Sequence, residues 1–245
     1  MTESKDMVSF NLDDLSTTGT FYFTDTLPGH LTTAHPHLDV NTHELINISI
    51  EIGKITQYHI YAIEPLTKTR KRIQTYQSDN TFYIHSFSIT NHYIILFKSP
   101  LVINKMKLML GFPFNHTLAY QENTSSFFIV IDRNTGKIDE IEAAPFVCLH
   151  SINAYEFENK IMLDLVCHAS GNPYDNLYLS NLRSSHPTLS TGKIKRYAIN
   201  LHSESCEQSI ISNSAHEFPR INYMRCNGKH YQFVYTTLLS HSEDL

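Results

Sequence analysis

The chain has 245 residues, of which 41% are hydrophobic and 18% are charged, so it can bury a sizeable core and is not intrinsically disordered. Its formal net charge is −5 and no basic block stands out, so no nucleic-acid partner is expected. No apolar run approaches the ~20 residues that span a bilayer, and the N-terminus is acidic, unlike a signal peptide. Four cysteines without a CxxC pair indicate reduced thiols, and we expect a cytoplasmic location.

Short runs rich in Ile, Tyr, Phe and Thr recur along the chain and predict β-strands. In chain order, we expect strands at residues 19–24, 45–52, 57–63, 73–76, 81–89, 92–97, 126–132, 137–142, 146–153, 160–166, 193–201 and 230–237. Turn-like residues at 132–136 and 156–159 join neighbouring strands as hairpins. The helix candidates are two short segments, 103–110 and 175–182. Because βαβ alternation is absent, the pattern predicts an all-β fold of antiparallel hairpins: a sandwich, barrel or propeller.

Three histidines stand in similar contexts, each at the margin of an expected strand. They are His35 in TAHPHLD, His85 in HSFSIT and His150 in HSINAYE. The intervals between them are each roughly one propeller blade of ~40–45 residues plus a loop, and equivalent blade positions converge on a propeller axis. Imidazole suits iron, copper, nickel or zinc better than magnesium or calcium. One interpretation is therefore a metal held by three imidazoles, and the other is a surface or core role for each histidine.

Six stretches stand out in chain order: TAHPHLD, HSFSIT followed by SPLVI, IDRNTGKI, HSINAYE, LYLSNLR, and EFPRIN followed by HYQFVYT. Taken together, they resemble the carotenoid cleavage oxygenase family, which includes carotenoid and apocarotenoid dioxygenases, stilbene dioxygenases and the retinoid isomerase of the retinal pigment epithelium. Order and spacing agree with the family over roughly residues 8–237. The resemblance implies a seven-bladed propeller of antiparallel blades under a dome of loops, with Fe(II) held on the axis by four histidines.

The resemblance assigns individual residues of this chain to the iron site. His35, His85 and His150 match three of the four ligands, and Glu217 in EFP matches a carboxylate that hydrogen-bonds a ligand imidazole. His37 follows the His-Pro pair and is not assigned to iron, and His168 is expected to be structural. The family's fourth histidine, in a His-Gly motif, has no counterpart. We therefore expect residues 1–245 to be a single but partial propeller domain, truncated at both ends: a fragment, a split-gene piece or a degenerate remnant.

The resemblance implies an enzyme, an Fe(II)-dependent dioxygenase that cleaves a conjugated C=C bond of a lipophilic polyene or stilbene with O₂ to give two carbonyl products. Retinoid isomerisation at the same iron site is an open alternative. A second hypothesis is a catalytically inactive propeller remnant that lacks the fourth histidine and binds a lipophilic ligand or a complementary chain. The segment from Ile103 to Phe114 pairs apolar residues with two lysines, which predicts peripheral membrane contact, with burial in the core as the alternative.

Overall fold

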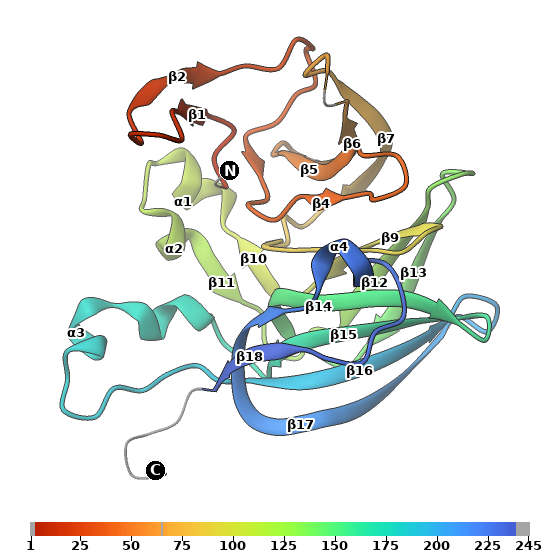
Figure 1. Ribbon diagram of the computed structural model, residues 1–245. Helices are drawn as coiled ribbons and strands as arrows, with labels where there is room; N and C mark the ends of the chain where they lie inside the picture. The colour runs from red at the N-terminus through yellow and green to blue at the C-terminus, as the bar shows by residue number, and fades with distance from the viewer. Residues whose placement is uncertain (1–2, 65, 239–245) are drawn as a thin grey trace. The chain divides into compact units, whose positions relative to one another are not determined.

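The computed structural model describes residues 3–64 and 66–238, and strands dominate this part of the chain. Contacts divide the chain into two compact units, Met1–Asn80 and Thr81–Leu245, whose elements are labelled in Figure 1. Among the described residues, no helix combines the length and the apolar character that a membrane crossing requires. The expectation that residues 1–245 form one partial domain stays a prediction.

The first unit consists of a hairpin and a sheet. Its strands are β1 (Met7–Phe10), β2 (Thr17–Phe21), β3 (Leu31–Thr32), β4 (His37–Leu38), β5 (Leu45–Glu51), β6 (Thr56–Ile63) and β7 (Arg70–Ser78). Strands β1 and β2 form the hairpin, and the sheet has the order β3-β5-β6-β7, with β4 also paired to β5. Ile46, Ile48 and Ile60 of its central strands are completely buried. The connection between β3 and β4 carries His35, which lies at the margin of strands, as the sequence predicts.

The second unit begins with the strands of two sheets and two short helices. These elements are β8 (Ser88–Ile89), β9 (Tyr93–Lys98), β10 (Leu101–Ile103), α1 (Lys105–Met109), α2 (Phe114–Thr117), β11 (Leu118–Tyr120), β12 (Ser126–Asp132) and β13 (Ile138–Ala143). One sheet pairs β10 with β11, and the other has the order β13-β12-β9-β8.

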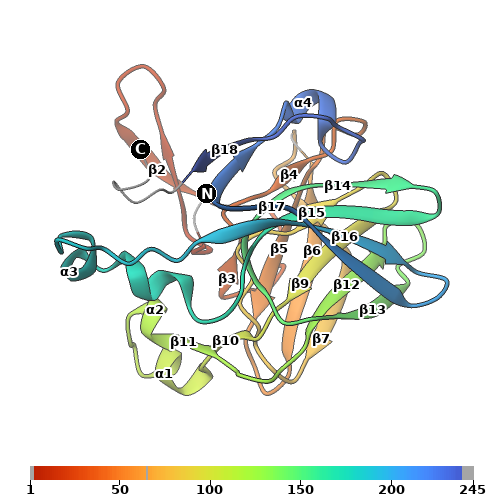
Figure 2. The same ribbon diagram turned by 90° about the horizontal axis from the view of Figure 1, so that it is seen from below.

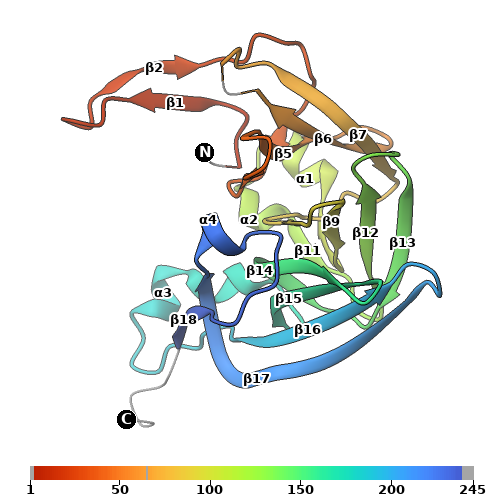
Figure 3. The same cartoon turned by 45° about the vertical axis from the view of Figure 1, so that its right-hand side comes forward.

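A five-stranded sheet completes the second unit. Its elements and connections are β14 (Val147–Phe157), β15 (Lys160–His168), η1 (Pro173–Leu177), α3 (Leu179–Leu182), β16 (Gly192–Asn200), β17 (Ser205–Arg220), α4 (Tyr223–Cys226) and β18 (Tyr235–Leu238). The strands follow one another in the order β14-β15-β16-β17-β18. Figures 2 and 3 show β14 to β17 side by side, with β17 farthest from β14.

Aromatic side chains form the core between the two larger sheets of this unit. Phe128 of β12 is fully buried, and its ring centroid lies 5.4 Å from that of Phe146 and 4.9 Å from that of Tyr197. Phe97 of β9 makes an edge contact with the same ring at 6.3 Å. Residues that alternate along β9, β12 and β15 face this cluster, because successive side chains of a strand point to opposite faces of its sheet. Cys148 and Ala154 of β14 belong to the same cluster, which therefore packs β14 against this core.

The prediction of an all-β fold of antiparallel strands is confirmed, because every strand pair in the described residues is antiparallel. The seven blades and the dome of loops stay predictions. The expected strand at residues 81–89 is wrong over most of its length, since only Ser88–Ile89 pairs as a strand there. Core burial is also wrong for the centre of the 103–114 segment, because Met109 and Leu110 are 85% and 69% exposed. These residues belong to a five-residue helix and the turn after it, and that helix buries no residue.

Candidate metal centre

His150 lies at an irregular part of β14. Along the β14–β15 ladder, Cys148 pairs with Cys167 and the next pair is Ser151 with Leu165, so the register shifts across the intervening residues. A β-bulge of this kind inserts extra residues into one strand and re-aims a side chain. The side chain of His150 remains 14% exposed, whereas the strand on either side of it is mostly buried. The local irregularity therefore presents His150 outside the regular alternation of the strand.

Ser86 satisfies the backbone groups that this bulge withdraws from the ladder. Its buried hydroxyl donates to the carbonyl oxygen of Leu149 at 2.6 Å and accepts the backbone N–H of Ser151 at 3.1 Å. Because buried backbone groups need partners, this one side chain stabilises the bulge. It also ties the segment that carries His85 to the strand that carries His150. The ring centroids of the two histidines lie 5.0 Å apart, with the planes nearly perpendicular at 86°.

Glu217 of β17 forms a hydrogen bond with the Nδ1 atom of His150. The His150 Nδ1 to Glu217 Oε2 distance is 2.7 Å, and Glu217 is 8% exposed. Burial raises the pKa of Glu217, but hydrogen bonds from His150, His168 and the backbone N–H of Phe218 outweigh burial and lower the pKa to about 2. The carboxylate is therefore ionised at neutral pH and can only accept. His150 must donate its Nδ1–H, so its Nε2 is the nitrogen that can bind a metal.

The backbone beside Glu217 is held in an unusual conformation. Phe218 has a φ of 52°, in the left-handed region that side chains other than glycine seldom adopt. In this conformation the Phe218 N–H donates to Glu217 Oε2 at 2.9 Å, and the Phe218 ring centroid lies 5.4 Å from that of His150. A left-handed residue of this kind costs roughly 1–2 kcal/mol, a strain that often accompanies functional sites.

The hydroxyls of two tyrosines lie within hydrogen-bond distance of the Nδ1 atom of His85. The Nδ1 atom lies 3.0 Å from the hydroxyl of Tyr83 and 3.2 Å from that of Tyr174, and the two hydroxyls are 2.7 Å apart. With Nδ1 engaged in this way, Nε2 is again the nitrogen for a metal. In that state His85 donates Nδ1–H to a tyrosine oxygen, a neutral acceptor in place of the carboxylate that His150 has.

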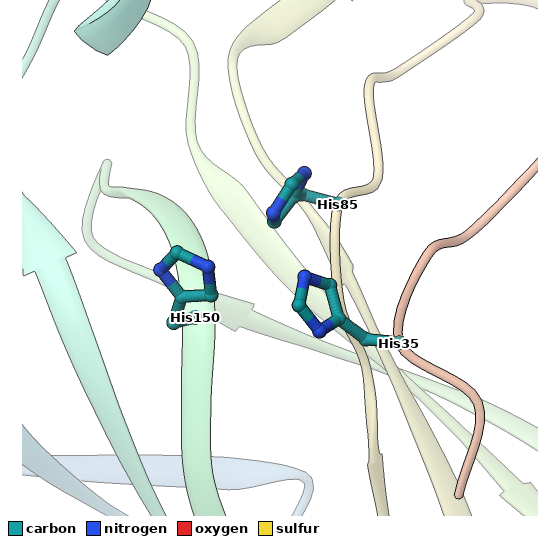
Figure 4. Close-up of side chains that lie close together, drawn as sticks. All are labelled: His35, His85 and His150. Carbon is teal, nitrogen blue, oxygen red and sulfur yellow. The ribbon is translucent and has the colours of Figure 1, made fainter. Parts of the chain in front are cut away.

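His35 completes a group of imidazoles. Its backbone N–H donates to Thr33 Oγ1 at 3.3 Å, and the Thr33 hydroxyl donates to Asn47 Oδ1 at 2.6 Å, which orders the backbone just before His35. One ring nitrogen from each of His35, His85 and His150 lies within 4.8 Å of the others. Figure 4 shows these three side chains close together. All three donors are imidazole nitrogens, and the Nδ1 atoms of His85 and His150 have hydrogen-bond partners that fix the orientation of each ring. This donor set fits a first-row transition metal.

Two residues of this network are not assigned by the sequence. His168 hydrogen-bonds Glu217, and Ser86 supports the bulge, yet the sequence predicts only a structural role for His168 and no role for Ser86. Their partners lie 49 and 63 residues away in the chain. Local patterns do not reveal such contacts. For Ser86, the usable signal was its position directly after a proposed ligand.

Comparisons with known proteins found relatives that cover most of the chain. A family model described as retinal pigment epithelial membrane protein matches residues 1–244. A carotenoid isomerooxygenase of Galleria mellonella is 24% identical over 83% of this chain, and the human mitochondrial carotenoid-cleaving dioxygenase is also 24% identical over 83%. These alignments cover 44% and 45% of the two relatives, so the chain spans about half their length.

A solved structure shares the fold. Cobalt-substituted apocarotenoid oxygenase from Synechocystis superposes with a TM-score of 0.82 at 21% identity, covering 99% of this chain and 52% of that one. At this identity, the likeness concerns the fold alone. It agrees with the antiparallel propeller class that the sequence resemblance implies.

Proposed function

Because the chain belongs to the retinal pigment epithelial membrane protein family, we propose that it forms the metal-binding part of a carotenoid-type dioxygenase. The proposed ligands are His35, His85 and His150, and the proposed ion is Fe(II). The observation that carries this proposal is the group of three imidazoles in which Glu217 orients His150. The Synechocystis protein with this fold is described as cobalt-substituted, which supports a metal site in this chain.

The proposed reaction is the cleavage of one conjugated C=C bond of a lipophilic polyene or stilbene by O₂, with two carbonyl products. When bound, Fe(II) supplies the activation of O₂ for that step. The residues of this chain orient the ligands: Glu217 acts on His150, and Tyr83 with Tyr174 acts on His85. We assign no acid–base residue, because the overall reaction adds both oxygen atoms without a net proton transfer.

We further propose that the segment from Ile103 to Phe114 makes a peripheral membrane contact. Met109 and Leu110 project from the short α1 region, and Lys107 lies on the same turn. Exposed apolar side chains next to lysines suit the boundary between headgroups and acyl chains. Co-sedimentation with anionic vesicles checks this proposal: a Met109→Ser, Leu110→Ser double variant should lose vesicle binding. Equal sedimentation of the variant and the wild type would contradict it.

The metal content of the chain tests the main proposal. We expect the wild-type chain, purified anaerobically and reconstituted with Fe(II), to hold stoichiometric iron, and His85→Ala to lose it. His92→Ala is the matched control, because His92 also pairs with a glutamate, Glu156, but is 58% exposed and lies outside the imidazole group. Iron in all three proteins, or in none, would contradict the proposed site. Absence of iron from the wild type would favour the alternative of an inactive propeller that binds a lipophilic ligand or a complementary chain.

A further inference from the structure

His168, the last residue of β15, is a buried histidine with a hydrogen-bond partner on each ring nitrogen. Its side chain is 2% exposed. The Nε2 atom lies 2.9 Å from Glu217 Oε1, and the Nδ1 atom lies 2.9 Å from the hydroxyl of Ser190. Glu217 therefore binds two imidazoles, one through each carboxylate oxygen: His168 through Oε1 and His150 through Oε2.

The carboxylate of Glu217 fixes the direction of its two hydrogen bonds with histidine. An ionised carboxylate only accepts, so His168 donates its Nε2–H to Glu217. In a neutral ring, Nδ1 is then an acceptor, and the hydroxyl of Ser190 donates to it. The resulting chain runs from Ser190 through His168 to Glu217, where the opposite oxygen receives the Nδ1–H of His150. In this arrangement His150 carries its proton on Nδ1, so Nε2 is the nitrogen that can bind a metal.

We propose that His168 is a positioning residue for the metal site and acts through Glu217. This inference deepens the proposed function and rests on it. The carboxylate has little contact with water, so its position is set by its donors. With His168 present, the negative charge is shared between two imidazoles and Oε2 stays aligned with His150. Without that donor, Oε1 is buried without a partner, and the carboxylate must reorient away from the geometry that orients His150.

Two substitutions that differ by one methylene group separate the functions of the two ring nitrogens. His168→Gln places an amide N–H near the position of Nε2 and keeps the bond to Glu217. His168→Asn places its amide near Nδ1, so it keeps the contact with Ser190 and withdraws the donor from Glu217. Loss of an outer partner of a metal ligand typically weakens metal binding by ~10–100-fold. We expect that loss for His168→Asn and near wild-type affinity for His168→Gln.

His59 of β6 offers a matched control, because it has the same bonding pattern away from the imidazole group. It is also 2% exposed, with Nε2 3.0 Å from Glu51 Oε2 and Nδ1 2.9 Å from Thr75 Oγ1. His59→Asn therefore withdraws an equivalent buried donor from a carboxylate. A purely structural role for His168 predicts that the two asparagine variants behave alike in metal binding.

The experiment is a titration of the full chain with Co²⁺, monitored by the visible ligand-field absorption, for the wild type and the variants of His168 and His59. The expected result is a ~10–100-fold weaker affinity and an altered spectrum for His168→Asn alone. Wild-type affinity and an unchanged spectrum for His168→Asn would overturn the inference. Lack of stoichiometric Co²⁺ binding by the wild type would overturn the proposed metal site itself, and this inference with it.

A measurement on the wild-type chain covers the case in which His168→Asn does not fold. In ¹⁵N-histidine NMR, we expect His168 to carry a proton on Nε2, the atom that faces Glu217. Addition of Zn²⁺ should shift its ring nitrogens through Glu217, while the ring nitrogens of His59 stay unchanged. Ring nitrogens of His168 that do not respond to Zn²⁺ would overturn the inference.

Discussion

Removal of the Ser86 hydroxyl is the sharpest test of how the site is built. In Ser86→Ala, the carbonyl of Leu149 and the N–H of Ser151 lose their buried partner in one step. A buried polar group left without a partner costs about 1–3 kcal/mol, so the two groups together predict a loss of roughly 2–6 kcal/mol in the free energy of unfolding. Typical domains are stable by only about 5–15 kcal/mol, so this change is large.

The same substitution should weaken metal binding, because Ser86 joins the segment of His85 to the bulge of His150. We expect the Co²⁺ affinity to fall at least ~10-fold, which corresponds to about 1.4 kcal/mol. Urea denaturation measures the first effect, and a Co²⁺ titration of the folded chain measures the second.

Ser126→Ala is a control with the same chemistry elsewhere in the unit. The buried Ser126 hydroxyl donates to the carbonyl oxygen of Phe146 at 3.2 Å and accepts the N–H of the same residue at 3.0 Å. Ser126→Ala should therefore destabilise the chain by a similar amount and leave the Co²⁺ affinity unchanged. The reasoning is refuted if Ser86→Ala costs less than about 0.5 kcal/mol, the range of an ordinary surface substitution, or if both variants weaken Co²⁺ binding equally.

Three further substitutions test the packing and the electrostatics. Arg196→Leu leaves the fully buried Asp164 carboxylate without its two 2.7 Å bonds and should cost about 3–5 kcal/mol in urea denaturation; a smaller loss would mean that water replaces the guanidinium. Phe128→Ala should lower the free energy of unfolding by about 3–5 kcal/mol in thermal melting, and a loss under about 1 kcal/mol would contradict the packing described. The third substitution is Asp25→Asn. Burial raises the pKa of Asp25, but hydrogen bonds from Arg70 and the backbone outweigh burial and hold this pKa below its ordinary value of 3.8. The ionised form therefore stabilises the fold above pH 3.8, and this contribution is lost as the pH falls through the folded-state pKa; Asp25→Asn should show a shallower acid loss, and equal acid curves would count against the pair.

The strands that could be predicted are those with a clear apolar pattern. Ser126–Asp132 was predicted with the bounds that the structure shows, since it is buried and bordered by a clear turn. Strand β17, Ser205–Arg220, was not predicted at all, because most of its residues are exposed and polar. Its pairing with β16 holds it in place, and a local pattern carries little information about such pairing. The strand expected at residues 81–89 failed for the opposite reason: its residues are buried but pair irregularly.

Spacing alone suggested that His35, His85 and His150 converge, and the family resemblance assigned them and Glu217 to an iron site. The structure brings His85, His150 and Glu217 together within the second unit. Burial of His168 was consistent with a structural residue, but its bond to Glu217 depends on how β15 and β17 meet in space. The assignment of the three histidines to iron stays a prediction until metal binding is measured.

The irregular strand that carries His150 has a consequence for which insertions the protein can tolerate. The β14–β15 hairpin is closed by Glu158 and Asn159, both with positive φ, and its ladder is regular from Phe157 to Ala154. A one-residue insertion within that ladder would move every side chain between the insertion and the start of β14, His150 included, to the opposite face. The number of residues between His150 and the tight turn therefore decides on which face of the strand this proposed ligand lies. Among homologous chains, length changes should therefore collect in the connection between α3 and β16 and be rare between His150 and the turn.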